Sequence, residues 1–287
     1  MVNSFKGKKQ NTTISIDLKT ERDSFSIKLT ADNDDIHHAK WLRNNERTPG
    51  FHLEIDLFQF LIYSLNTPAL RGMTHESKED PLGIYGEKLD MLIANFGTKE
   101  REMLKKYSYM IEWLDDFLID TNDVLKLKGF KQNLSQSRLY FSDKFMSKQN
   151  NIFSSENANE GILHVLFYLA AMISEDTPPF FAIDNNDACL NPHLCRELMS
   201  EICTLAKQEN CDKQLLITTH NPAILDGLNL FDDEIRLFEV KRLENGNTKT
   251  RRIMLKPTIE NDMGERYKLS ELWTRGYLGA KPQNFYS

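Results

Sequence analysis

Apolar and polar residues alternate in two runs near the start of the chain, residues 12–18 and 24–30. Apolar residues at every second position predict two β-strands, and the short polar link between them predicts a hairpin. The charged stretch 32–50 has no clean period and predicts a loop or a short exposed helix. Residues 51–65 are apolar and rich in β-forming residues up to Thr67-Pro68, which predicts a strand that ends in a turn.

The middle of the chain changes to helical spacing over residues 83–120. Its apolar positions form two groups, Leu89, Leu92, Ile93 and Phe96, then Met103, Tyr107, Met110, Ile111, Leu114, Phe117 and Leu118. This spacing predicts two amphipathic helices with solvated outer faces. Alternation returns in residues 124–131 and 138–145, and it predicts two further strands.

After residue 150, predicted helices alternate with short, nearly all-apolar strands. The helices are Asn159–Ser174, Asn191–Gln208 and Pro222–Leu228, and the strands that follow them are Pro179–Asp184, Gln214–Thr218 and Glu234–Val240. This order predicts a parallel sheet with helices on both faces, so the expected fold class is α/β. The turn at residues 244–247 predicts a hairpin at the edge of the sheet. We therefore expect an N-terminal hairpin and helical insertion over residues 1–150 and an α/β core over residues 151–287.

Composition narrows the class of protein. The 287 residues include 36 Lys and Arg against 42 Asp and Glu, a formal net charge of −6. This charge balance argues against a strongly basic protein that coats nucleic acid. Local contact with DNA remains an alternative for the basic patch of Lys249, Arg251 and Arg252. The longest apolar run, residues 162–173, is too short to span a bilayer, and residues 1–10 have no apolar signal segment. The sequence thus predicts a cytoplasmic protein without a membrane segment.

Candidate chemistry lies where two predicted strands end. The first strand is followed by Asp184, Asn185 and Asp187, and the next one by Thr218, Thr219 and His220. Ligands of open parallel sheets bind at the carboxyl ends of the strands, so these side chains are expected at one edge. A strand that ends in aspartate suits a magnesium–nucleotide site, because Mg²⁺ keeps several waters and takes one or two carboxylates. The structural alternative is that Asp184 caps the next turn and that Asn221 caps a helix beside His220.

Three motifs resemble those of ABC-type ATPases, the class that includes the SMC-like, recombination-repair and OLD-like AAA proteins. The run FFAIDNNDACLNPHL (residues 180–194) is similar to the Walker B motif and D-loop, and LLITTHNPAILDGL (residues 215–228) to the strand and switch histidine. The run SSENANEGILHVLFYLAAMI (residues 154–173) stands where the family has its signature helix. The closing LSELWTRGYLGAKPQNF (residues 269–285) resembles the tail of a bacterial subgroup linked to anti-phage defence.

This resemblance implies ATP and Mg²⁺ as cofactors and a P-loop NTPase-like sheet. Asp184 would hold Mg²⁺ through water, and His220 would contact the γ-phosphate. A phosphate seat at a helix N-terminus would consist of Asn159, Glu160 and Gly161, and in the family it serves the nucleotide bound by the other protomer. Asn191 would belong to the D-loop that faces the partner. Head-to-tail dimerisation is therefore part of the implied mechanism.

The sequence departs from the family pattern at three places. Asn185 stands where the family has a catalytic glutamate, so Asn185 or Asp187 would position the attacking water. Asn159 stands in place of the signature serine. No G-x-x-x-x-G-K-[ST] loop is present, because Lys9 follows the single Gly7-Lys8 pair where Ser or Thr is needed. The chain is thus expected to be a truncated ATPase, one half of a split ATPase, or a relative that does not hydrolyse ATP.

Three functional interpretations follow. The first is ATP binding and hydrolysis coupled to dimerisation, in anti-phage defence or DNA processing. The alternative is a non-catalytic interaction or regulatory module that pairs with a complete ATPase. The third is a metal-dependent nuclease that uses Asp184 and Asp187. An Asp184→Ala variant separates them, because it would abolish metal-dependent chemistry but leave partner binding intact.

Overall fold

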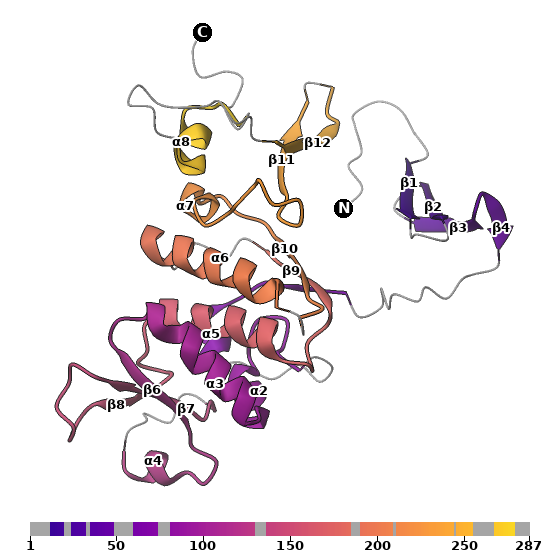
Figure 1. Ribbon diagram of the computed structural model, residues 1–287. Coiled ribbons are helices and arrows are strands. Elements are labelled where there is room, and N and C mark those ends of the chain that lie inside the picture. The colour runs from indigo at the N-terminus through magenta and orange to yellow at the C-terminus, as the bar shows by residue number, and fades with distance from the viewer. Residues whose placement is uncertain are drawn as a thin grey trace. The chain divides into compact units, whose positions relative to one another are not determined.

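The structure, a computed structural model, is shown in Figure 1. It describes residues 12–19, 24–32, 35–48, 60–73, 81–129, 136–184, 190–208, 211–243, 245–254 and 267–278. The chain divides into two compact units, Met1–Phe58 and Gln59–Ser287. Each unit is described by itself below.

The first unit is an antiparallel sheet with the strand order β1-β2-β3-β4. Its strands are β1 Thr12–Lys19, β2 Ser24–Asp32, β3 Asp35–Arg43 and β4 Glu46–Thr48. Strands β1 and β2 confirm the predicted hairpin. The expectation of a loop or helix over residues 32–50 is wrong, because β3 and β4 lie there. They are joined at Asn44 and Asn45, whose φ angles of 50° and 67° suit a two-residue hairpin turn.

The second unit contains a parallel sheet with the order β10-β9-β5, which confirms the α/β fold class. Its strands are β5 Leu61–Tyr63, β9 Phe180–Ile183 and β10 Gln214–Ile217, and the helices that alternate with them are α5 Glu160–Ile173, α6 Pro192–Ala206 and α7 Pro222–Leu225. Helices α5, α6 and α7 and strands β9 and β10 agree with elements predicted after residue 150. The part of the predicted strand 51–65 that precedes Phe60 lies outside the described residues.

The third predicted strand of the parallel sheet, Glu234–Val240, does not join it. Strand β11 (Leu237–Arg242) pairs instead with β12 (Thr248–Ile253) in a separate two-stranded antiparallel sheet (Figure 1). The predicted basic hairpin is therefore confirmed. The prediction that it lies at the edge of the parallel sheet is wrong, because among the described residues its strands pair only with each other. The third parallel strand is β5, which lies far upstream in the sequence.

Helix α5 is the centre of the main core. Every residue from Ile162 to Met172 is buried, as its nearly continuous apolar sequence predicts. The ring of Phe167 on α5 contacts Tyr63 of β5 edge-to-face, with 5.2 Å between ring centroids. Helix α6 packs beside α5 (Figure 1). Among the described residues, no helix is long and apolar enough to cross a membrane.

The insertion between β5 and α5 differs most from the sequence prediction. It contains α1 Thr67–Leu70, α2 Leu89–Asn95, α3 Thr98–Tyr107, the 3₁₀ turn η2 Ser108–Met110, β6 Leu114–Ile119, α4 Val124–Leu127, β7 Leu139–Asp143 and β8 Ile152–Ser154. The second predicted helix ends early, since β6 occupies its last part and pairs with β7. Thr67-Pro68 begins a short helix and not a turn, because proline is favoured in a first helical turn.

Residues 124–127 form a helix and not the predicted strand, because of a contact that the alternation of apolar residues does not reveal. The buried Asp120 carboxylate accepts hydrogen bonds from the amides of Val124, Leu125 and Lys126, at 2.9, 2.8 and 3.1 Å. A carboxylate that accepts several free amides stabilises the start of a helix. The remaining predicted strand of this region is confirmed as β7.

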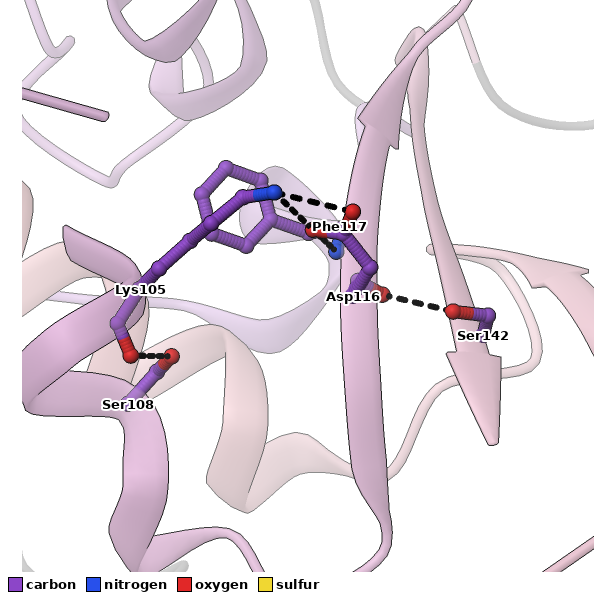
Figure 2. A network of polar contacts seen from close by, with 5 residues as sticks. All are labelled: Lys105, Ser108, Asp116, Phe117 and Ser142. Carbon is purple, nitrogen blue, oxygen red and sulfur yellow. Dashed lines mark hydrogen bonds and ion pairs between the residues drawn. The ribbon is translucent and has the colours of Figure 1, made fainter. Parts of the chain in front are cut away.

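Figure 2 shows how α3 is fastened to β6. The Lys105 ammonium lies 2.8 Å from Oδ1 of Asp116, and it also lies over the Phe117 ring at 5.8 Å from the centroid. Ser142 of β7 donates to the Asp116 carbonyl at 3.3 Å, and Ser108 donates to the Lys105 carbonyl at 3.0 Å. The pair is largely exposed, so it orients the two elements more than it stabilises them.

Candidate functional site

Asp184 and Thr218 meet at the carboxyl ends of neighbouring parallel strands. Asp184 follows β9, and its amide donates to the carbonyl of Tyr63 in β5 at 2.9 Å. Thr218 follows β10, and its amide donates to the carbonyl of Ile183 at 3.2 Å. The Thr218 hydroxyl donates to Oδ1 of Asp184 at 2.5 Å. Backbone pairing thus places both side chains at one exposed edge, where the sequence predicted a carboxylate.

His220 lies two residues beyond Thr218 and is exposed. Helix α7 begins directly after it, because Oδ1 of Asn221 accepts the Ala223 amide at 3.0 Å as an N-cap. The same Asn221 donates through Nδ2 to the buried Sγ of Cys195 on α6, at 3.3 Å. The alternative that Asn221 caps a helix is therefore confirmed. It also fixes the backbone that presents His220, so the cap and a ligand role for His220 are compatible.

The N-terminus of α5 is tied to the same end of the sheet. Oδ1 of Asn159, an exposed residue, accepts the Ile162 amide at 3.0 Å as the N-cap of α5. Arg71, just past α1, donates through Nη2 to the Ala158 carbonyl at 2.9 Å. Because Arg71 follows the carboxyl end of β5, this bond holds the α5 N-terminus near that end of β5. Glu160 and Gly161 form its first turn.

Helix α6 starts in the same manner. Asn191 is exposed, and its Oδ1 accepts the Leu194 amide at 2.9 Å. The preceding Leu190 is buried, and its carbonyl accepts from the thiol of Cys195 at 3.7 Å. The two predicted water-positioning residues, Asn185 and Asp187, lie outside the described residues. Their roles remain predictions.

The chemistry of Asp184 fits a solvated divalent cation. One carboxylate oxygen of Asp184 accepts from Thr218, and the Asp184 side chain is exposed to solvent. Carboxylate and hydroxyl oxygens are the ligand types that Mg²⁺ takes when it keeps most of its waters. In the described part of the chain, no group of three or more His, Cys, Asp or Glu side chains is arranged to hold a metal ion. The described residues therefore do not form a site in which several protein side chains coordinate the metal directly.

The opposite end of the sheet is held by Lys213, just before β10. Its ammonium donates to the Thr177 carbonyl and hydroxyl, at 2.5 and 2.7 Å, in the connection that leads from α5 to β9. Burial lowers the pKa of Lys213 to about 8. This contact fixes the start of β10 against the start of β9 and so supports the alignment of Thr218 with Asp184.

The sequence argument assigned no role to two residues of this arrangement. Thr218 had a visible signal, because a hydroxyl residue directly follows an apolar strand beside the one that ends in Asp184. Arg71 had no such signal, since its partner Ala158 is distant in sequence and is contacted through a backbone carbonyl.

Comparison with known proteins gives one family and a group of solved structures. Residues 88–226 match the family described as "AAA domain, putative AbiEii toxin, Type IV TA system". No curated protein sequence matches the chain. Among solved structures, the SMC head domain from Thermotoga maritima aligns with a TM-score of 0.44 and 10% identity, over 84% of this chain and 73% of that one.

A second solved structure, an SMC head bound to the C-winged helix domain of ScpA, aligns with a TM-score of 0.48 and 12% identity. The alignment covers 81% of this chain and 69% of that chain. The family match spans the chain from just before α2 to the end of α7, including Asp184, Thr218 and His220. Residues 88–226, within the second unit of this protein, are therefore similar to an AAA domain.

Proposed function

We propose that the carboxyl edge of the β10-β9-β5 sheet binds ATP together with Mg²⁺, and that binding and hydrolysis are coupled to head-to-tail pairing of two protomers. The observation that carries this proposal is the bond between Thr218 and Asp184, which brings a hydroxyl and a carboxylate together at the ends of two parallel strands. The match to an AAA domain over the same residues supports it.

Each group has a defined task in this proposal. Asp184 holds Mg²⁺ through water, and Thr218 orients the carboxylate by its hydrogen bond. His220, presented by the capped start of α7, contacts the γ-phosphate. When bound, Mg²⁺ supplies positive charge to the phosphates. Phosphoryl transfer depends mainly on such positioning and charge stabilisation.

The two capped helix starts would serve the partner protomer. The first amides of α5 point out of a fourteen-residue helix, so its N-terminus attracts an anion. Asn159, Glu160 and Gly161 would therefore contact the nucleotide held by the other protomer, and Asn191 would face that protomer. Asn185 or Asp187 would position the attacking water. The similarity of residues 269–285 to a defence-linked subgroup supports a role in anti-phage defence or DNA processing.

Magnesium-dependent binding of a fluorescent ATP analogue tests the site. We expect Asp184→Asn to remove the magnesium-dependent part of binding while the fold, followed by circular dichroism, stays intact. Asp212→Asn is the matched control, because Asp212 is also exposed but precedes β10 at the opposite end of the sheet. Equal binding by Asp184→Asn and the wild type, or no magnesium-dependent binding by the wild type, would reject the site.

Light scattering with and without ATP tests the coupling to pairing. We expect ATP and Mg²⁺ to increase the dimer fraction of the wild type, and we expect Asn159→Asp to reduce this increase by adding a like charge at the phosphate seat. A dimer fraction that is independent of nucleotide would contradict the coupling.

A non-catalytic interaction module is the second candidate, and one observation favours it. Leu216 of β10 and Ile62 of β5 are 50% and 54% exposed although they lie in a parallel sheet. Parallel strands are usually buried on both faces. The sheet therefore has a surface suited to a protein partner.

A further inference from the structure

Helix α7 depends on contacts with other elements for its position. It is a single turn of four residues, Pro222–Leu225, and so short a helix is not stable by itself. His220 lies just before its N-cap residue, Asn221. The contacts that hold α7 therefore also decide where the His220 side chain is presented, and they lie at both ends of the helix.

The start of α7 is held by the residues on either side of His220. The Thr219 hydroxyl accepts the Asn221 amide at 3.0 Å, which makes a turn with His220 at its centre. Asn221 caps α7 and also donates to Sγ of Cys195 on α6. The backbone of His220 is therefore fixed as long as α7 stays in place.

The end of α7 is held by a carboxylate that contacts helix α8 (Leu269–Thr274). Asp226 directly follows α7. Its Oδ1 accepts the Ser270 amide at 2.9 Å, and its Oδ2 accepts the Ser270 hydroxyl at 2.7 Å. The N-cap residue of α8 is Lys268, whose side chain has no acceptor atom. Asp226 therefore supplies the carboxylate acceptor that the first turn of α8 lacks.

Apolar packing joins the same two helices. Leu225, the last residue of α7, forms a small buried cluster with Leu269 and Leu272 of α8. Helix α8 lies beside α7 (Figure 1). Because Leu225 directly precedes Asp226, the apolar contact and the two hydrogen bonds act at the same point of the chain. Together they fasten α8 to the end of α7, so a displacement of one helix is passed to the other.

We propose that Asp226 and Ser270 are positioning residues for His220. The pair docks α8 onto α7, and α7 in turn holds the turn that presents His220 beside Thr218. Helix α8 is thus part of the scaffold of the candidate site. Because coupling between two positions is reciprocal, a ligand that contacts His220 also stabilises α8. The contact of His220 with a γ-phosphate rests on the proposed function; its positioning by α8 does not.

Histidine side-chain NMR of the nucleotide-free full chain tests the positioning. The protein carries isotope-labelled histidine, and the His220 signal is identified by its absence from His220→Gln. We expect this signal to shift or broaden in Asp226→Ala, which removes the acceptor of both bonds. Ser270→Ala should have a smaller effect in the same direction, because it removes the hydroxyl donor and keeps the amide donor.

Two variants serve as matched controls. Thr274→Ala removes an exposed hydroxyl of α8 that donates to a carbonyl of its own helix at 3.0 Å. Asp120→Ala removes a carboxylate that accepts the first amides of α4, so it makes the same chemical change as Asp226→Ala at another helix. Thermal melts establish that every variant is folded. An unchanged His220 signal in Asp226→Ala, or an equal change in either control, would overturn the proposal.

Binding of a fluorescent ATP analogue with Mg²⁺ separates this proposal from the proposed function. Two hydrogen bonds to a carboxylate are enough to change the balance between docked and undocked α8 by about tenfold. We therefore expect Asp226→Ala to raise the Kd of the analogue about tenfold, and Asp120→Ala to leave it unchanged. A His220 signal that moves as expected, in a wild type that binds no analogue, rejects the proposed function and not the positioning.

Discussion

Gly227 fixes the distance between α6 and α7, and replacing it by alanine tests how the His220 backbone is held. Gly227 follows α7, and its amide donates to the Ile224 carbonyl at 3.1 Å. A Cβ atom at this position would lie 2.4 Å from the Arg196 carbonyl oxygen and 2.9 Å from Cβ of Met199. Both atoms belong to α6, so a methyl group cannot be accommodated by turning a flexible side chain.

The expected cost follows from that geometry. Ordinary contact between such atoms needs about 3.4 Å or more, so α7 and α6 must separate by about 1 Å. Overpacking of this kind costs about 1–3 kcal/mol, and a backbone obstacle favours the upper part of this range. The lower entropy of the unfolded alanine chain returns about 0.4–1 kcal/mol. The net loss in the free energy of unfolding is therefore about 2 kcal/mol.

Denaturant unfolding and thermal melts measure this loss. For a unit of this size, about 2 kcal/mol corresponds to a fall in Tm of roughly 4–8 °C. Gly97→Ala is the control, because a Cβ atom there meets the Glu100 carboxylate at 3.7 Å and nothing closer. The separation of α6 from α7 should also weaken the Asn221–Cys195 bond and so disturb His220. A Gly227→Ala protein as stable as Gly97→Ala would refute this reasoning.

Three further predictions concern the elements around the site. Asn221→Ala removes the cap of α7 and should cost about 1 kcal/mol, whereas Asn221→Ser keeps a capping oxygen and should restore most of it in urea unfolding. The Asp226 carboxylate accepts hydrogen bonds from the amide and the hydroxyl of Ser270, at 2.9 and 2.7 Å. Asp226→Ala should lower the stability of α8 (Leu269–Thr274) by about 1–3 kcal/mol and so speed its amide hydrogen exchange. Exchange unchanged from the wild type would contradict this role. Burial lowers the pKa of Lys213 from 10.5 to about 8, so between these two pH values the unfolded chain binds more protons than the folded chain. The free energy of unfolding of the wild type, measured relative to Lys213→Met, should therefore rise with pH across this window. A difference that does not depend on pH would contradict the lowered pKa.

Local patterns in the sequence were sufficient for much of the second unit. Helices α5 and α6 and strands β9 and β10 were predicted from apolar period and length, because each element buries a face whose pattern is contained in its own residues. Since the carboxyl ends of parallel strands share an edge, Asp184 and His220 could also be assigned to one edge in advance. The β1–β2 hairpin was predicted for the same local reason.

Tertiary contacts decided the remaining elements. The sequence of β6 carries apolar spacing that also suits a helix, and pairing with β7 makes it a strand. Residues 124–127 alternate like a strand, but the Asp120 carboxylate holds their amides in a helical turn. In both cases, contacts outside the segment outweigh a weak local preference.

The arrangement of the site also depended on residues that are distant in sequence. By itself the sequence determined an α/β core, its helix–strand order and the polar residues at the strand ends. The tertiary structure decided that β5 is the third parallel strand, that Thr218 bonds to Asp184, and that Leu216 and Ile62 lie on the same face of the sheet. The physical reason is that strand pairing and face coverage join segments far apart along the chain, and no local period records which segments meet.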